Sequence, residues 1–562
     1  MKIPRKSIYI LGVLLFLSLA IRSYVAFNAE MHPDELVYNV RAINMLEARR
    51  INTIDQAPIY FYLVDILFKI FGITNFASRL LSVLSGTLLV LIIYFIIKEI
   101  FENESAAIFS AFFVAIGSYY NLNLIEMDQV AGFFSILSFL FFIKAIKYEK
   151  LNLYLISAIF SAIGILNKST MLVTLPAFLF YGIFNLHKPL FVKKMALSKR
   201  RIKHLAVFFI LMGILLLPII IANYLLYQDK GYGDILFTRF LSKDKGPYAG
   251  LSGIDNSWSF SYFSKKIIEF PALLFTMDFF TLLFFIIWLI FFKKNFNHYA
   301  LLIWGLLPLL FLLGTSAMDV HLAPFTIIFS IFAGLMLEKI CQNLKNSYVL
   351  LIVLTIALSF IYLTFLNLGE RSSVLKLRDF ALETEKDSFV IADSALYRGR
   401  IAWAFNDRNY LESANFYQIH QASKNEEFEK RIVYFVECAA ESCGWAEDAT
   451  SQIKEVNKPF IDYILKNSPK ITHIKQGEKL IYIVYRAEIP LPSGIGKFAD
   501  AGKSFYFYPV GWKQTEDLVD GYSIDNFFEK IIETFARILL YVEIFVAIIG
   551  LFVPLFLWYE EF

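Results

Sequence analysis

Two adjacent carboxylates follow the first apolar segment of this chain. Asp34 and Glu35 stand shortly after the apolar run Ser7–Phe27, with Pro33 directly before them. A carboxylate held near a reacting hydroxyl can take its proton as a general base, and paired acids are compatible with a divalent cation. A structural alternative exists, because Asp and Glu also suit the N-terminus of a helix. This segment alone leaves both interpretations open.

Three other short segments between apolar runs carry groups that could act on a polar substrate. Asp128 stands just before an apolar run, with Glu126 beside it, Lys168 divides two apolar stretches, and His321 follows Asp319 in a short connection. A lysine in so short a turn is held close to the membrane surface, at the height of lipid phosphates. Each group also has an ordinary interpretation, as a helix start or a surface residue.

Arg79 opens the second long apolar run, where a guanidinium can bind an anion or simply extend toward lipid headgroups. Charges inside the apolar runs are nearly absent, so we expect any site at the membrane surface and not at its midplane. A divalent cation (Mg, Mn or Zn) is possible there, with Asp34 and Asp128 as candidate ligands, although no ligand spacing demands one.

The elements that position these residues follow from composition. Hydrophobic residues make up 57% of the 562 residues and charged residues 18%, below the roughly 25% usual in soluble domains. Apolar runs recur at about 20 residues, the length of a helix that crosses a bilayer. We therefore predict a polytopic α-helical membrane protein and exclude a soluble one. Nucleic acid is not an expected partner, because no basic stripe with interleaved aromatics is present.

About twelve transmembrane helices are predicted, of which the shortest are the least distinct. They are expected at residues 8–27, 78–98, 105–121, 130–147, 152–167, 170–186, 205–226, 272–292, 299–316, 321–340, 348–367 and 534–558.

Basic residues predict the orientation. His187–His204 holds seven Lys and Arg residues and no acid, and Lys2, Arg5 and Lys6 precede the first span. Both segments should be cytoplasmic, and the even number of spans between them agrees with this. Both termini are then cytoplasmic, and the segments with candidate site residues share the outer face of the cytoplasmic (plasma) membrane.

The first outer connection should contain two interfacial helices. Residues 36–50 show helical apolar spacing with a polar face, as in helices that lie along a membrane surface. Ile59–Phe71 is too short and too charged to span, because Asp65 and Lys69 interrupt it.

Residues 368–533 differ from the rest, since charge rises and apolar runs shorten to strand length. The stretches "SFVIADSA", "RIVYFVE" and "KLIYIVYRAEI" predict strands, and 412–430 is typical of a helix. We expect a catalytic membrane domain at 1–367, a small extracytoplasmic α/β domain at 368–533, and a C-terminal transmembrane helix at 534–562. Cys438 and Cys443 can form a disulfide in an oxidising compartment or remain free thiols.

The ordered set of motifs resembles the GT-C superfamily of membrane glycosyltransferases. Within it, the sequence is most similar to the branch of aminoarabinose transferases and protein O-mannosyltransferases. The stretches that carry the resemblance are "HPDELVY", "APIYFYLVDILFKIFG", "SRLLSVLSG", "EMDQVAGFF", "LNKSTML" and "VHLAPF". It covers the first 340 or so residues well and the remainder only in layout.

The chain departs from the family where Gln56, Ala57 and Pro58 replace a lysine and two prolines of many members. One phosphate-binding cation of those members is therefore missing. There is also no "WWDYG"-type motif and no inserted domain, which argues against oligosaccharyltransferases and eukaryotic protein mannosyltransferases.

The resemblance implies an inverting transfer of a sugar from a polyprenyl-phosphate donor (undecaprenyl or dolichyl) to a protein, lipid or glycan acceptor at the bilayer. Asp34 would be the catalytic base, and Lys168 and Arg79 would neutralise the departing phosphate. Asp128 would position the acceptor or help hold a metal. Glu35 and His321 would bind substrate.

Three other functions are compatible with such a chain. A secondary transporter would need repeated halves, broken spans and polar groups at the midplane, and none is evident. A flippase or an inactive scaffold would bind the same lipid-linked sugar without transferring it.

Overall fold

The computed structural model describes residues 4–560 with several gaps. The gaps are residues 49, 52–56, 124–126, 184–198, 232, 234–257, 292–295, 316–318, 394–395, 397, 407, 414–426, 441–457, 468 and 494–521. Four features discussed above lie outside the described residues: Gln56, Glu126, Cys443 and most of the basic segment His187–His204.

Helices dominate the first 368 residues and the C-terminus. In chain order they are α1 (Arg5–Asn28), α2 (Pro33–Ala42), η1 (Met45–Glu47), α3 (Ile59–Phe71), α4 (Asn75–Phe101), α5 (Glu104–Ile116), α6 (Ser118–Leu122), α7 (Met127–Tyr148), α8 (Leu151–Asn167), η2 (Ser169–Thr174), α9 (Leu175–Ile183), α10 (Lys199–Leu215), α11 (Leu217–Lys230), α13 (Phe260–Met277), α14 (Phe279–Phe291), α15 (Phe296–Leu313), η4 (Asp319–Leu322), α16 (Ala323–Cys341), α17 (Asn346–Leu368) and, at the end, α23 (Phe527–Glu560).

By length and composition, six of the described helices can cross a membrane: α1, α4, α7, α16, α17 and α23. The pair α10 and α11, bent by 44° at a short break, would make a seventh. The other predicted spans coincide with shorter apolar helices, at Glu104–Ile116, Leu151–Asn167, Ser169–Ile183, Phe279–Phe291 and Asn297–Leu313. The chain is thus a polytopic helical membrane protein, while twelve crossings and their orientation stay a prediction.

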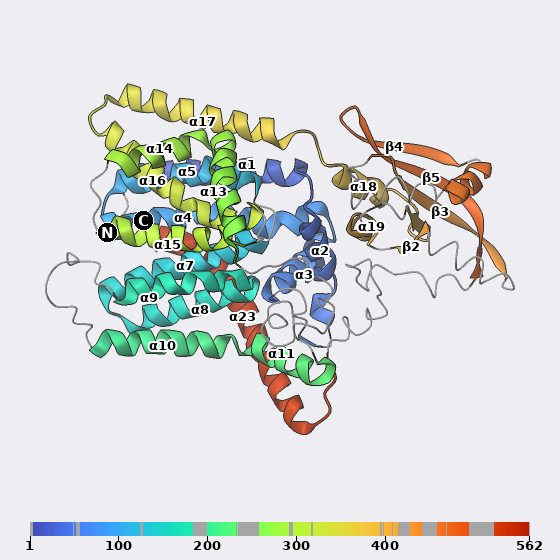
Figure 1. Cartoon of the computed structure of the whole chain (residues 1–562), viewed down its shortest axis with the longest axis horizontal. Coiled ribbons are helices and arrows are strands. Elements are labelled where there is room, and N and C mark those ends of the chain that lie inside the picture. Colours follow the sequence, from blue (N-terminus) through green and yellow to red (C-terminus); the bar gives the residue numbers. More distant parts are fainter. Residues whose placement is uncertain are drawn as a thin grey trace.

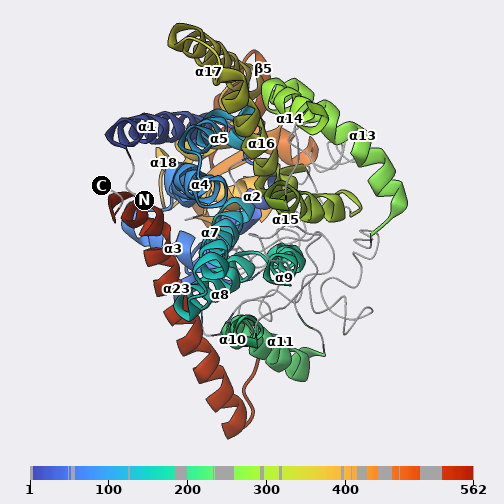
Figure 2. The same cartoon turned by 90° about the vertical axis from the view of Figure 1, so that its left-hand side faces the viewer.

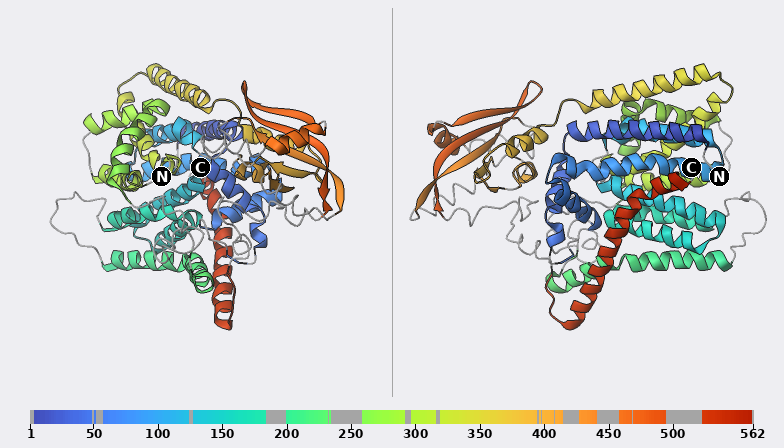
Figure 3. Two further views of the ribbon diagram at one scale, coloured as in Figure 1. Left: turned by 45° about the vertical axis from the view of Figure 1, so that its right-hand side comes forward. Right: turned by 180° about the vertical axis from the view of Figure 1, so that it is seen from behind.

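The helices form a bundle with α4 and α7 near its centre (Figure 2). Both are almost wholly buried, whereas only 17% of the apolar window of α17, at the periphery, is buried. Close packing needs small residues here, because a Cβ on Gly334 of α16 would lie 2.3 Å from the Ser110 backbone of α5. The long helix α23 crosses the bundle obliquely (Figure 3).

The first connection after α1 holds α2, η1 and α3. The predicted helix at Ile59–Phe71 is confirmed with the same bounds, as it begins after Pro58 and ends at Gly72, which has φ +77°. The helix expected at 36–50 instead ends at Ala42 and is followed by η1.

Asp65 explains that early end. Its carboxylate accepts the backbone N–H groups of Asn44 (3.3 Å) and Leu46 (2.8 Å), so α3 caps the turn η1. Burial raises the pKa of this carboxyl, and the two N–H donors counteract the rise. Asp65 therefore has a structural role that the sequence showed only as an interruption.

A five-stranded mixed sheet lies beyond the α1–α3 end of the bundle (Figure 1). Its strands are β1 (Phe389–Ala392), β2 (Asn409–Glu412), β3 (Phe428–Cys438), β4 (Lys470–Gln476) and β5 (Lys479–Pro492), in the order β2-β1-β3-β5-β4. β1 pairs in parallel with β2 and β3, and β5 is antiparallel to β3 and β4.

The three predicted strands match β1, β3 and β5. The helix expected at 412–430 has strand residues of β2 and β3 at its ends, and 414–426 lie outside the described residues. Cys438 is disulfide-bonded, and Cys341 is a free, buried thiol. The side of the membrane on which this sheet lies stays a prediction.

Two helices join the sheet to the bundle. They are α18 (Ser373–Leu382) and α19 (Arg398–Ala404), and α19 packs against α2. The buried Arg378 donates to Ala404 O (2.7 Å) and to Ile73 O (2.9 Å), which links both helices to the start of α4. We call the five strands together with α18 and α19 the sheet domain. It packs against the segment that carries Asp34 and Glu35.

Candidate functional site

The adjacent carboxylates lie in the first turn of α2, where they differ in environment. His32 caps this helix through its Nδ1, which accepts the Asp34 N–H at 3.2 Å. The cap is therefore His32, and Asp34 is not needed for it. Asp34 is half-buried, whereas Glu35 is 1% exposed. Neighbouring positions on a helix point about 100° apart, so the two carboxylates face different surroundings.

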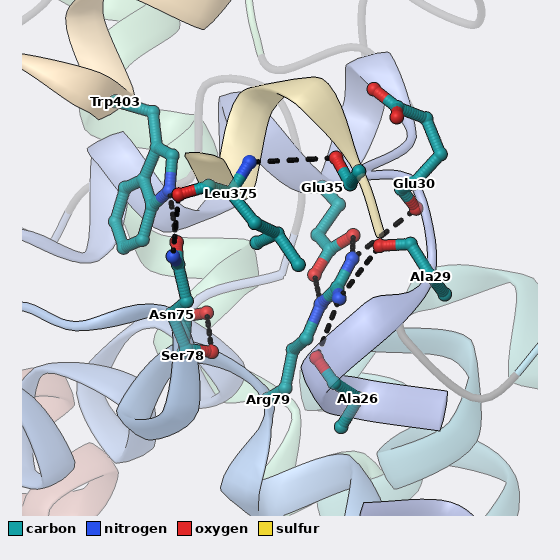
Figure 4. Close-up of polar contacts among 10 residues, drawn as sticks. Ala26, Ala29, Glu30, Glu35, Asn75, Ser78, Arg79, Leu375 and Trp403 are labelled. Atoms are coloured by element: carbon teal, nitrogen blue, oxygen red, sulfur yellow. Dashed lines mark hydrogen bonds and ion pairs between the residues drawn. The ribbon is translucent and has the colours of Figure 1, made fainter. Parts of the chain in front are cut away.

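Glu35 forms a buried ion pair with Arg79 (Figure 4). Arg79 Nε and Nη2 donate to the two carboxylate oxygens at 2.5 and 2.9 Å. The remaining donors reach the backbone carbonyls of Ala26 (2.7 Å), Ala29 (3.0 Å) and Glu30 (3.2 Å). A guanidinium has five N–H donors, and all five are used.

These contacts join α4 to the connection between α1 and α2. They use every N–H of Arg79 and both oxygens of Glu35 within the protein, so the predicted substrate-binding roles of these two residues would require an exchange of these bonds. In this arrangement the pair holds the backbone next to Asp34.

A second cluster brings together three predicted site residues from segments far apart in the chain. Asp128 lies in the first turn of α7, Lys168 between α8 and η2, and His321 in η4. Asp128 Oδ2 accepts from the Lys168 ammonium and lies 2.7 Å from His321 Nδ1. Lys168 Nζ lies 3.1 Å from the same ring nitrogen.

Unlike the Glu35–Arg79 pair, this cluster has unused polar atoms. Asp128 and Lys168 are each 2% exposed, yet Asp128 Oδ1 has no hydrogen-bond partner among the described residues. Three other buried oxygens, on residues close to Asp128 or Lys168 in the chain, also have no hydrogen-bond partner among the described residues. They are Gln129 Oε1, Asn167 Oδ1 and Thr170 Oγ1. Buried polar atoms without partners are costly, so a polar ligand or water is expected to satisfy them.

Tyr38 connects this cluster to Asp34. Tyr38 follows Asp34 by four residues in α2, so both lie on the same face of the helix. The Lys168 ammonium lies 5.9 Å from the centroid of the Tyr38 ring. The face of α2 that carries Asp34 is therefore turned toward Lys168.

A pocket lies beside the cluster, on the side of the bundle interior. Its lining includes Gly132, one turn after Asp128, and Met171 and Thr174, just after Lys168. Pro324 and Phe325, just after His321, close another side. The cavity has room for about one water molecule, about 10 Å³, so it is a small gap in the packing near the charged cluster.

A metal site does not emerge from this geometry. In the part of the chain that the structure describes, no three His, Cys, Asp or Glu side chains gather closely enough to hold a metal ion. The Lys168 ammonium already occupies Asp128 Oδ2 and would repel a divalent cation there. The ligand role of Asp34 and Asp128 stays a prediction, and no step below uses a metal.

The sequence reasoning missed two residues near the site. Tyr38 could have been found from its helical spacing to Asp34. Arg22 is fully buried inside α1, where it donates to Ser18 Oγ (2.8 Å) and Val114 O (3.0 Å). An arginine within an apolar run was itself the signal.

Comparisons with known proteins agree with this architecture. Residues 55–228 match the sequence profile described as dolichyl-phosphate-mannose-protein mannosyltransferase. The structure superposes on ArnT from Cupriavidus metallidurans bound to undecaprenyl phosphate, with a TM-score of 0.50 and 11% identity, over 84% of this chain and 97% of that one. The chain therefore has the fold of ArnT, and its residues 55–228 resemble the dolichyl-phosphate-mannose-protein mannosyltransferase family. The resemblance predicted from the sequence is thereby confirmed.

A second solved structure is similar with a lower TM-score. The archaeal oligosaccharyltransferase AglB from Archaeoglobus fulgidus, in complex with an inhibitory peptide and a dolichol-phosphate, gives a TM-score of 0.47 at 14% identity. That match covers 87% of this chain and 76% of AglB. No curated protein sequence matches the chain.

Proposed function

We propose that this protein is a GT-C glycosyltransferase that transfers a sugar from a polyprenyl-phosphate donor to a hydroxyl of a protein, lipid or glycan on the outer face of the plasma membrane. The observation that carries the proposal is that the Lys168 ammonium lies 5.9 Å from the ring of Tyr38, which is one helical turn from Asp34 in α2. A base and a phosphate-binding cation must lie on opposite sides of one anomeric carbon, and Tyr38 brings their segments together. The superposition on ArnT, whose structure holds undecaprenyl phosphate, supports this class of donor.

The reaction is a single displacement. The acceptor oxygen attacks the anomeric carbon while its proton passes to the Asp34 carboxylate. The bond between that carbon and the phosphate oxygen breaks, and its electron pair stays on the phosphate. The configuration is inverted, as expected when attack and departure occur on opposite faces.

Lys168 stabilises the phosphate as charge develops on it. The ammonium is buried beside Asp128, so its charge acts in a site of low dielectric constant. Asp128 and His321 orient the ammonium, and the unsatisfied oxygens nearby are available to sugar hydroxyls.

Glu35 and Arg79 act as positioning residues in this proposal. Their ion pair and the carbonyls of Ala26, Ala29 and Glu30 fix the backbone that precedes Asp34. The sheet domain then lies on the same outer side, as the basic cytoplasmic segments predict.

The test is a transfer assay with purified protein in lipid, a panel of radiolabelled polyprenyl-phosphate sugars, and membrane extract as the acceptor. We expect transfer by the wild type, and a loss on the order of a thousandfold in Asp34→Asn, which cannot accept the proton. Glu47→Gln is the matched control, because this carboxylate belongs to the same connection, is 66% exposed and pairs with Lys69 (2.6 Å). A parallel reaction with EDTA measures metal dependence directly.

Three results would overturn parts of the proposal. Donor binding without turnover by the wild type would favour a flippase or scaffold. Full activity in Asp34→Asn would remove the base assigned here. Retention of the anomeric configuration in the product would exclude a single displacement.

A further inference from the structure

The sheet domain contacts the start of α4 through a buried indole (Figure 4). Trp403, in α19, is fully buried and donates from Nε1 to Asn75 Oδ1 at 2.9 Å. Its ring packs against Phe68 of α3, with the ring centroids 6.0 Å apart. Asn75 is the first residue of α4, and its amide lies 3.5 Å from Leu375 O of α18. Asn75 is thus held by both helices of the sheet domain.

One helical turn separates Asn75 from the ion pair that supports Asp34. Ser78 Oγ donates to Asn75 O at 2.9 Å, and Arg79 follows in the same turn. Arg79 binds Glu35 and the carbonyls of Ala29 and Glu30. A shift of Asn75 therefore moves the guanidinium that fixes the α1–α2 connection.

The sheet domain also contacts that connection directly. Ser372 N–H donates to Asn28 O at 3.0 Å, and Arg400 of α19 lies 3.8 Å from the Glu30 carboxylate. Arg79 and the sheet domain thus reach the connection by separate routes. The segment before Asp34 is held from two directions.

We propose that docking of the sheet domain through Trp403 and Asn75 sets the position of Asp34. Trp403 and Asn75 are then positioning residues for sugar transfer. The inference rests on the proposed function for its catalytic consequence, and on the contacts alone for its structural one. Loss of the indole hydrogen bond loosens the start of α4 and, through Arg79, the α1–α2 connection. The hydrogen bonds of Lys168 are to Asp128 of α7 and His321 of η4, so we expect the donor phosphate to bind with unchanged affinity.

The test uses the full chain in lipid nanodiscs, with Trp403→Phe, Asn75→Leu and the double variant. Trp403→Phe keeps an aromatic ring against Phe68 and removes only the N–H donor. Tyr434→Phe is the matched control, since it removes one hydrogen bond, to Glu385, inside the sheet domain without touching α4.

Hydrogen–deuterium exchange of peptides covering residues 28–42 is the first readout, and it requires no activity. We expect faster exchange there in Trp403→Phe and Asn75→Leu, a similar increase in the double variant, and none in Tyr434→Phe. The second readout is transfer, where kcat should fall roughly five- to tenfold while the affinity for polyprenyl phosphate stays unchanged.

Unchanged exchange over 28–42 in both single variants would overturn the proposal. So would additive effects in the double variant, because the two residues would then act independently. If the wild type transfers no sugar, the proposed function fails, while the exchange experiment still decides whether docking positions this segment.

Discussion

Two buried charge clusters of this protein use the same types of residue differently. In the Glu35–Arg79 pair, every guanidinium donor and both carboxylate oxygens have partners within the protein. In the Asp128–Lys168–His321 cluster, one carboxylate oxygen and several neighbouring oxygens have none among the described residues. A satisfied buried pair builds structure, and a partly satisfied one is suited to binding.

The largest effect on stability is expected at the Glu35–Arg79 pair, which we call the closed pair because all its polar atoms have partners within the protein. Arg79→Met leaves the Glu35 carboxylate buried without its cation and frees three carbonyls, so we expect the free energy of unfolding to fall by about 3–5 kcal/mol. The measurement is thermal or denaturant unfolding in detergent.

Arg79→Lys is the companion variant, because it keeps the charge but cannot reproduce five directed hydrogen bonds. It should lie between the wild type and Arg79→Met. A stable Arg79→Met protein that has lost donor binding would mean that Arg79 binds substrate after all.

The next largest effect is expected on transfer activity, at the Asp128–Lys168–His321 cluster. In Lys168→Met we expect kcat/KM for transfer to fall by on the order of a hundredfold, because the departing phosphate loses its cation. Stability should fall less than in Arg79→Met, since His321 Nδ1 stays 2.7 Å from Asp128 Oδ2 and the carboxylate keeps a hydrogen-bond partner.

The same stability loss in Lys168→Met and Arg79→Met, with transfer retained in the former, would erase the distinction between the two clusters. Lys168→Arg is the control for charge, and it should keep part of the activity.

The smallest effect comes from an exposed charge cluster in the sheet domain. Glu385 accepts from Arg486 Nε (3.0 Å) and Nη2 (2.8 Å) and from the Tyr434 hydroxyl. These hydrogen bonds, from Arg486 foremost, lower the pKa of Glu385 to about 2. Because the folded pKa lies below the usual 4.5, the stabilisation is complete above that pH and is lost as the pH falls from 4.5 toward 2.

Solvent screening keeps this contribution small. We expect Glu385→Gln to lower the melting temperature slightly at pH 7 and not at pH 2, with transfer unchanged at pH 7. An equal difference at both pH values would contradict the pKa shift.

The local sequence pattern was enough to predict those helices whose ends are marked by residues such as proline and glycine. Ile59–Phe71 was predicted to the residue because apolar residues fill it and Pro58 and Gly72 mark its ends. The helix at 36–50 was predicted too long, because the contact of Asp65 with the turn after Ala42 is tertiary. The prediction at 412–430 failed at its ends for a related reason, since pairing with neighbouring strands decided their structure.

The candidate site divides in the same way. The resemblance selected Asp34, Asp128, Lys168 and His321, and the last three meet in space. The difference in burial and hydrogen bonding between Asp34 and Glu35 was not predictable. It depends on Arg79, which is 44 residues from Glu35 in the chain, and on backbone carbonyls that have no sequence signature.

The most direct test of this account is the binding of polyprenyl phosphate without a sugar, measured on wild type, Lys168→Met and Glu35→Gln in nanodiscs. This ligand needs the phosphate site but no catalysis. We predict at least a tenfold loss of affinity in Lys168→Met and an affinity close to wild type in folded Glu35→Gln. Unchanged binding in Lys168→Met, with a loss in Glu35→Gln, would show that the closed pair binds the phosphate and would contradict the account.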